Sequence, residues 1–139
     1  MLAGKINVTS TSMTAEDLKK EIHFIDDAKV TQDKNWIHGD LIIVYFDENN
    51  ETKKYEAIGK VTFEYDQNSS FYKGSADKIT YYPVEAKYIL TGKAIVDDLI
   101  NKRHVAGNEI VLDTVTGNAD VKGSKKKPVK FIFNSKDKK

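Results

Sequence analysis

The sequence predicts an all-β fold, and three observations support that prediction. Apolar and polar residues alternate over several long segments, as expected for strands with one buried face and one face in water. Segments of turn composition separate them. No segment of helical length repeats its apolar residues at the spacing of an amphipathic helix. We therefore expect a chain of strands and turns.

A recurring pattern indicates that these strands form repeated hairpins. It consists of a small residue, an acid or amide, any residue and an aliphatic residue, with copies that start at Ala15, Gly39, Ala76 and Gly107. After each copy, apolar residues at alternate positions lead to a small one, at Ala28, Gly59, Gly92 and Gly123, spaced by 31, 33 and 31 residues. A period of this length usually indicates one stacked supersecondary unit.

The first hairpin is the least regular. Residues 2–13 alternate weakly and predict an N-terminal strand. Residues 15–20 resemble a helix start, but the repeat favours a strand there. In residues 22–32, Asp26 stands at a position that is apolar in the other copies, and Ala28 replaces a glycine. We expect this hairpin to be the least well packed.

The second hairpin has the clearest strand signals. Its apolar run, Leu41 to Phe46, predicts a strand that is buried on both faces or covered by a neighbour. Residues 47–52 have the composition of a turn. Residues 55–65 alternate cleanly, which predicts one apolar and one solvated face.

The remaining chain continues the pattern. Residues 75–96 form the third hairpin, with Pro83 at its bend, where proline is better tolerated than inside a central strand. Residues 105–121 form the last full unit. After a break at residues 125–128, residues 129–133 predict one more alternating strand.

Length and composition fit one soluble domain. A chain of 139 residues can bury about two-thirds of its unfolded surface. The absence of cysteine excludes disulfides and thiolate chemistry. The first residues do not resemble a signal peptide, so the chain is either cytosolic or processed. Eight lysines and one acid follow from Lys122 onward, and we expect a single domain over residues 1–133 and a basic, flexible tail over residues 134–139.

No residue pattern points to catalysis or to a metal. His23, His38 and His104 are isolated and lack the spacing of paired ligands. Adjacent acids fall in predicted turns, where they share one environment instead of the two that acid–base catalysis needs. Asp40 and Asp77 hold equivalent repeat positions and are expected to cap turns. We expect no enzyme activity, no metal and no cofactor.

Two other binding functions remain open from the residues alone. A carbohydrate- or nucleic-acid-binding domain would use exposed aromatic residues, for which Trp36, Phe71 and Tyr82 are candidates. The net acidic repeat region argues against nucleic acid, because phosphate binding depends on positive charge. A structural or adaptor domain would pack its interior fully and act only through its strand edges.

The repeat resembles the OstA-like family. The motifs that carry the resemblance are Gly59 to Phe63, Ser75 to Ile79 and Tyr88 to Ala94, and it covers Met13 to Phe133. The resemblance implies a β-jellyroll of two facing antiparallel sheets, built from repeated hairpins and open along one seam. It also implies a non-enzymatic carrier and bridge in the periplasm, which shields the lipid A acyl chains of lipopolysaccharide between the inner and outer membranes.

The implied partners are lipopolysaccharide, the related jellyroll domains of the inner-membrane and outer-membrane transport components, and further copies joined end to end. Nucleic acid is not among them. Strand edges have unpaired backbone groups that accept another strand. We expect end-to-end assembly at Ile6, Val8, Val129, Phe131 and Phe133.

The inward faces of the aligned strands supply the expected lipid contacts. Carrying a lipid needs no catalytic residue, only an apolar lining. Each CH₂ group of an acyl chain that is buried against such a lining contributes about 0.8 kcal/mol to the free energy of binding. The expected lining residues are Ile42, Val44, Phe46, Tyr55, Val61, Phe63, Ile79, Tyr81, Tyr88, Leu90, Val96, Ile110, Leu112 and Val121.

Overall fold

The computed structural model describes residues 4–135, and these residues form ten β-strands. The strands are β1 (Asn7–Thr9), β2 (Ser12–Glu16), β3 (Glu21–Gln32), β4 (Asn35–Phe46), β5 (Thr52–Gln67), β6 (Ser70–Tyr82), β7 (Lys87–Asp98), β8 (Arg103–Asp113), β9 (Ala119–Lys122) and β10 (Lys130–Phe133). Within this part of the chain, no helix is long and apolar enough to cross a membrane. Most of the predicted basic tail lies outside the described residues.

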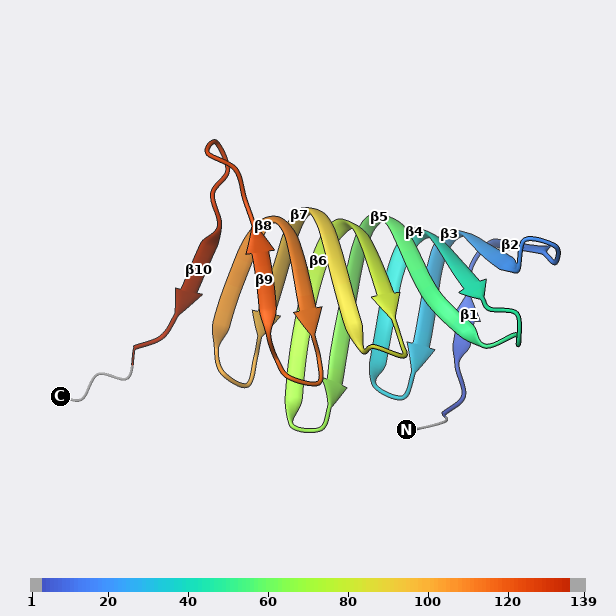
Figure 1. Ribbon diagram of the computed structural model, residues 1–139, viewed down its shortest axis with the longest axis horizontal. Helices are drawn as coiled ribbons and strands as arrows, with labels where there is room; N and C mark the ends of the chain where they lie inside the picture. Colours follow the sequence, from blue (N-terminus) through green and yellow to red (C-terminus); the bar gives the residue numbers. More distant parts are fainter. Residues whose placement is uncertain (1–3, 136–139) are drawn as a thin grey trace.

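All ten strands belong to one antiparallel sheet, as Figure 1 shows. The strand order is β1-β3-β4-β5-β6-β7-β8-β10, with β2 also paired to β3 and β9 also paired to β8. Neighbours along the chain therefore pair in space, as a repeated hairpin requires. The sheet has two free ends, and the all-β prediction is confirmed.

The long strands β3 to β8 bend at β-bulges near their middle. All five pairings among them shift register at this level. Residues 26–27 of β3, 59–60 of β5 and 92–93 of β7 are the bulged pairs, and all six residues have positive φ. A bulge adds a residue to one strand and bends it. In Figure 1 the strands arch together along this line of bends.

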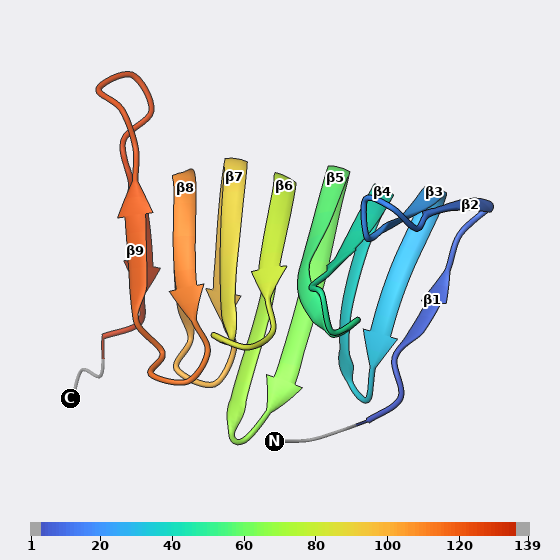
Figure 2. The ribbon, with the colours of Figure 1, turned by 45° about the vertical axis from the view of Figure 1, so that its right-hand side comes forward.

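The bends divide the sheet into two facing layers (Figure 2). The first layer contains β2, residues 21–25, 41–46, 52–58, 78–82, 87–91 and 109–113, and β9. The second contains β1, residues 28–32, 35–39, 61–67, 70–76, 94–98 and 103–107, and β10. Phe63 of the second layer stacks on Tyr88 of the first, with ring centroids 4.4 Å apart. The two predicted sheets are thus two halves of one sheet folded over a common core, which gives the expected jellyroll.

Strand register corrects the alignment of the first hairpin. Asp26, not Ala28, holds the position of Gly59 and Gly92, and the spacing between these three positions is 33 residues in both intervals. Ala28 instead matches Val61 and is fully buried. Aspartate reaches positive φ more readily than most residues, so an acid can occupy this bulge.

The four-residue pattern at Ala15 is not a copy of the repeat. β2 ends at Glu16, and a turn follows in which Leu18 is fully exposed. The true counterpart of Gly39 and Asp40 is residues 10–11, because Thr9 and His38 both pair with Lys29.

Asp40 and Asp77 do not cap turns, since they lie within β4 and β6. Their carboxylates pack over the bulge glycines, where a Cβ on Gly59 would overlap Asp40 and one on Gly92 would overlap Asp77. The glycines are therefore needed both for positive φ and for this close approach.

Candidate functional site

The space between the two layers contains every residue predicted to line the interior. Eleven of the fourteen are buried in one apolar cluster, and Phe46, Tyr81 and Val121 are partly buried against it. Their position follows from the strand geometry, because alternate residues point to the same face. Lipid contact by these residues stays a prediction.

Sequence reasoning missed several members of this cluster. They are Ala28, Val30, Ile37, Tyr65, Tyr72 and Ala76. With bulges aligned at a spacing of 33 residues, Val30 falls on the same position as Phe63 and Val96. The corrected repeat spacing was therefore the signal that could have found Ala28 and Val30.

Aromatic rings from both layers meet in the middle of the interior. Tyr88 stacks on Phe63 across the layers and on Tyr81 within its own layer, where the ring centroids are 4.5 Å apart. Tyr65 meets Tyr88 edge to face at 6.3 Å, and Tyr55 stacks on Tyr81 at 6.0 Å. Such pairs add attraction beyond the area that they bury.

Burial keeps Tyr55, Tyr81 and Tyr88 uncharged at neutral pH. Burial raises the pKa of Tyr88 well above its ordinary value and that of Tyr81 to about 12. Burial also raises the pKa of Tyr55, against a smaller opposite effect of its hydrogen bond with Thr52. The interior therefore presents neutral phenols among apolar side chains, a surface suited to an uncharged chain.

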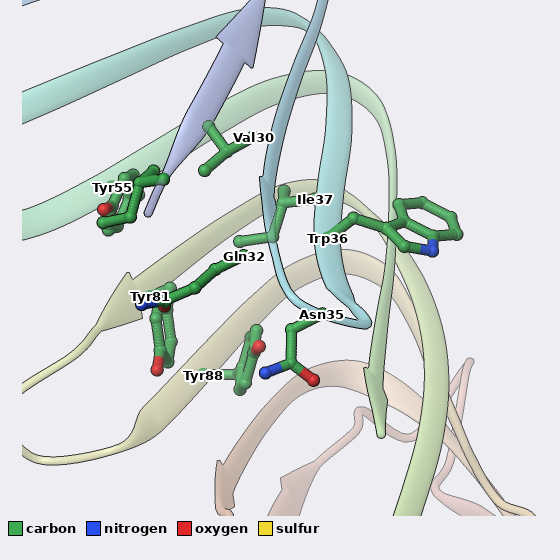
Figure 3. Close-up of a pocket in the computed structure, with 9 residues that line it drawn as sticks. Val30, Gln32, Asn35, Trp36, Ile37, Tyr55, Tyr81 and Tyr88 are labelled. Carbon is green, nitrogen blue, oxygen red and sulfur yellow. The ribbon is translucent and has the colours of Figure 1, made fainter. Parts of the chain in front are cut away.

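A pocket lies between the layers on the N-terminal side of this aromatic group (Figure 3). We call it the N-side pocket, and the space in and around its mouth, open solvent included, is about 370 Å³. It is lined by Ile6, Val30, Gln32, Asn35, Trp36, Ile37, Tyr55, Tyr81 and Tyr88. Apolar and aromatic side chains with a few amides are the usual lining of a ligand site.

A second pocket lies at the other end, and we call it the C-side pocket. The space in and around its mouth, open solvent included, is about 700 Å³. It is lined by Tyr72, Val96, Asp98, Arg103, Val105, Ile110, Leu112, Gly117, Asn118, Ala119 and Phe131. Phe131 belongs to β10, so the last strand contributes to this pocket.

A polar cluster sits at the edge of the C-side pocket. The Arg103 Nη2 donates to Asp98 Oδ2 at 2.8 Å, and Asn101 donates to both carboxylate oxygens through its backbone N–H and its side-chain amide. Burial raises the pKa of Asp98, but these hydrogen bonds outweigh it and hold the pKa below its ordinary value. The Asp98 carboxylate is therefore charged at neutral pH, and both of its oxygens accept hydrogen bonds.

The two pockets are separated by a packed middle. They share no lining residue. Between them, Val61, Ile79, Leu90 and Ala94 are fully buried, and Phe63 is only 1% exposed. Across residues 4–135, these two pockets thus lie at opposite ends of the interior, with a closely packed centre between them.

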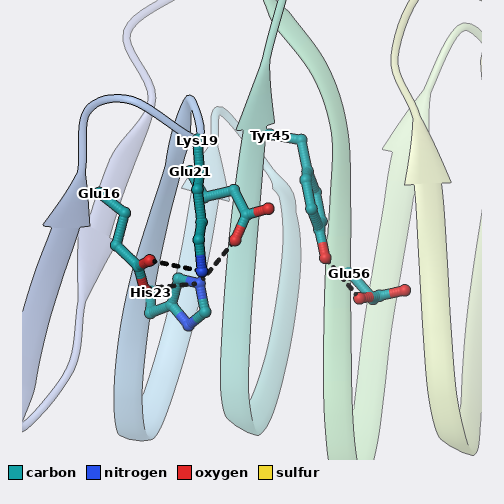
Figure 4. Close-up of polar contacts among 6 residues, drawn as sticks. All are labelled: Glu16, Lys19, Glu21, His23, Tyr45 and Glu56. Atoms are coloured by element: carbon teal, nitrogen blue, oxygen red, sulfur yellow. Dashed lines mark hydrogen bonds and ion pairs between the residues drawn. The ribbon is translucent and has the colours of Figure 1, made fainter.

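A group of polar side chains interacts on the outer face of the first layer, as Figure 4 shows. His23 Nε2 lies 2.9 Å from Glu21 Oε1, and Tyr45 donates to Glu56 Oε1 at 2.8 Å. The other two histidines each contact one carboxylate, His38 with Asp27 and His104 with Asp97. No group of three possible metal ligands occurs among the described residues.

The residues predicted for end-to-end assembly lie at the two ends of the sheet. Ile6 precedes β1 and lines the N-side pocket, and Val8 lies in β1 and packs against the core. Val129, Phe131 and Phe133 are 43%, 52% and 60% exposed. The sheet ends therefore combine free edges with exposed apolar side chains.

The three aromatic residues proposed for carbohydrate or nucleic acid are partly buried. The Lys29 amine lies over the Trp36 ring, and the Lys73 amine lies over Phe71. Lysine amines thus already occupy two of these ring faces, which leaves less surface for stacking a sugar or base.

Comparison with known proteins identifies the family. The family model described as "LptA/(LptD N-terminal domain) LPS transport protein" matches residues 7–118. The crystal structure of LptH from Pseudomonas aeruginosa, described as the LptA homologous periplasmic component of a lipopolysaccharide transport device, superimposes with a TM-score of 0.83 at 18% sequence identity, over 95% of this chain and 96% of that chain. This likeness confirms the open jellyroll fold. No curated protein gives a significant match. Because the family model covers most of the chain, this protein belongs to the LptA/LptD N-terminal domain family of lipopolysaccharide transport proteins, as the OstA-like repeat predicted.

Proposed function

We propose that the protein carries lipopolysaccharide in the periplasm by holding its acyl chains between the two layers. The family is one of transport proteins, which agrees with the expectation of a non-enzymatic role. The observation that carries the proposal is the pair of pockets between the layers, one on each side of the aromatic group, which are lined mainly by apolar and aromatic side chains. The fourteen predicted lining residues are the proposed contacts.

The layered fold suits a molecule that is part lipid and part sugar. Acyl chains gain about 0.8 kcal/mol for each CH₂ group removed from water. The two layers are joined along the bends and are not joined at the turns. The acyl chains of a lipopolysaccharide can therefore lie between the layers while its sugar and phosphate groups stay in water. A chain that passes from the N-side to the C-side pocket must displace the Phe63–Tyr88 contact.

Bridge formation is the second part of the proposal. We propose that residues 1–133 act as one domain, whose sheet edges join further copies and the related jellyrolls of the inner-membrane and outer-membrane components. The support is that β1 with β2, and β9 with β10, leave one backbone edge unpaired at each end of the sheet. Free edges of this kind accept another strand.

Site-specific photocrosslinking tests the carrier proposal. A photoreactive phenylalanine at Phe63, Tyr81 or Tyr88 keeps an aromatic ring at an inward position. The matched controls are Thr62 and Thr91, which are exposed on the outer face, Thr62 directly beside Phe63. After irradiation with purified lipopolysaccharide, we expect inward positions to label at least about tenfold more strongly than the controls, since acyl chains reach only the inner face.

Equal labelling of both faces would contradict the carrier proposal. The packed middle supports one competing function, an adaptor that acts only through its edges. In that case no inward position labels, while the chain still binds its related jellyrolls. Labelling at Tyr81 without labelling at Phe63 would restrict the lipid to the end pocket.

A further inference from the structure

The last strand of the sheet is interrupted by a protruding loop at the line of bends. β9 and β10 together pair along the length of β8, just as β7 does on the other side. Glu109 and Ala106 of β8 pair with β7 on one side and with the last strand on the other. In β7 the residues that pair with these two are separated by three residues, 92–94. In the last strand they are separated by seven residues, 123–129. In Figure 1 the additional residues rise above the bends at the C-terminal end.

This loop, which we call the basic loop, is ordered and positively charged. The Ser124 N–H donates to the Lys127 carbonyl oxygen, and the Lys127 N–H donates to Ser124 Oγ, so a closed turn presents its tip. That tip carries Lys125 and Lys126, and all three lysines of the loop are exposed. Within residues 4–135, no carboxylate forms an ion pair with any of the three. The loop therefore offers three cations that have no acidic partner among the described residues.

The opposite end of the line of bends is acidic. Where β5 and β7 have Gly59-Lys60 and Gly92-Lys93, β3 has Asp26 and Asp27. Both aspartates are exposed, and the side chain of Asp27 is 77% exposed although it contacts His38. The two ends of the line of bends thus carry opposite charge.

The strand directions allow these two ends to meet. β9 and β10 run from the first layer to the second, while β1 and β2 run from the second to the first. A second copy placed beside β10 therefore presents its β1 and β2 antiparallel to β10 and β9 of the first copy. In this arrangement the first layer of one copy continues into the first layer of the next, and the second layer into the second. Its β3 then lies two strand spacings, about 10 Å, from β9 and β10. A seven-residue loop that leaves the sheet and returns reaches on the order of 10 Å.

We propose that the basic loop of one copy contacts Asp26 and Asp27 of the next copy and acts as an electrostatic latch that selects the C-terminal-to-N-terminal joint. Pairing of two strand edges uses backbone hydrogen bonds, which any strand can form, so it does not by itself select a partner. The latch adds a charge pattern that favours this pair of edges in the register that aligns the two lines of bends, and it disfavours joints between two basic ends. The inference rests on the proposed end-to-end assembly.

A charge exchange tests the latch. The loop variant carries Lys125→Glu, Lys126→Glu and Lys127→Glu. The bulge variant carries Asp26→Gly and Asp27→Lys, which gives the first bulge the Gly-Lys sequence already present in β5 and β7, so it introduces no new backbone strain. Self-association of the full chain is measured by sedimentation at several concentrations, in about 50 mM and about 0.5 M salt.

We expect each variant alone to weaken association about tenfold at low salt, the effect of a few exposed ion pairs acting together, and much less at high salt. A chain with both sets of changes, or an equal mixture of the two variants, should regain part of the lost association, because opposite charges again face each other, although the new bulge carries one charge where the wild type carries two. Circular dichroism and thermal unfolding of each variant confirm that the fold is retained.

Each remaining outcome separates the latch from the assembly on which it depends. If Phe131→Asp abolishes association but the loop variant does not weaken it, end-to-end joining stands and the latch is wrong. If the wild-type chain stays monomeric at every concentration, both fail. If the loop variant associates normally but loses binding to vesicles rich in anionic lipid, the basic loop serves a lipid surface and the latch is overturned.

Discussion

The packed middle and the C-side pocket have the same strand geometry, yet only one of them has empty space. Phe63 and Val96 hold the same repeat position, as does Val30 at the other end. Val30 lines the N-side pocket and Val96 lines the C-side pocket, whereas Phe63 is 1% exposed in the middle. One aromatic side chain in place of a valine thus coincides with the division of the interior into two pockets. The fold sets where the interior lies, and single side chains set how much of it is open.

The largest effect is expected from emptying the middle. Phe63→Ala removes a buried ring that packs on Tyr88, and we expect a loss of about 3–5 kcal/mol in the free energy of unfolding. Urea denaturation measures this loss. Val30→Ala, at the same repeat position beside a pocket, is the control and should cost clearly less. Equal costs for the two variants would mean that the middle is no better packed than the ends.

A smaller effect is expected from filling the two regions. Val61→Phe adds a ring where the side chain is fully buried, and we expect a cost of about 1–3 kcal/mol from overpacking. Val96→Phe places the ring beside the empty C-side pocket, so its cost should stay below about 1 kcal/mol. Thermal unfolding compares the two variants. The Val96 variant should also bind less lipopolysaccharide, and unchanged binding would argue against acyl chains in this pocket.

The smallest effect concerns the charged edge of the C-side pocket. The pKa of Asp98 is lowered in the folded state, so its charge stabilises the fold above its ordinary pKa of 3.8, and this contribution is lost as pH falls through the folded value. Asp98→Asn should cost about 1 kcal/mol at pH 7, a figure reduced by the exposure of Arg103. Urea unfolding of both proteins at pH 7 and pH 3 measures it, and the difference between them should shrink at pH 3. A difference that grows in acid has the wrong sign for this explanation.

The alternation of apolar residues was enough to place the predicted lining inside, because a strand shows every second residue to the same face. It could not show how full the interior is. That property depends on which side chains meet across the layers, such as Phe63 and Tyr88, whose contact joins distant parts of the sequence. The absence of cysteine and of ligand spacing argued against catalysis, which agrees with membership of a family of transport proteins.

The errors in the first hairpin have a common cause. The sequence pattern looked for a small residue at each bend, whereas the first bend uses Asp26 and Asp27 with positive φ. A single chain offers no signal that an acid takes the place of glycine, although aspartate tolerates this conformation. The matching pattern at Ala15 then displaced the alignment further, since four residues of such loose type recur by chance.

The common line of bends has a mechanical consequence. Every long strand passes through it, so the backbone hydrogen bonds on either side lie wholly within one layer. Rotating the two layers apart about this line breaks contacts between the side chains of the two layers but leaves the backbone hydrogen bonds within each layer intact. Separating the layers in this direction therefore requires no backbone hydrogen bond within a layer to break, whereas stretching the sheet along its length would break them.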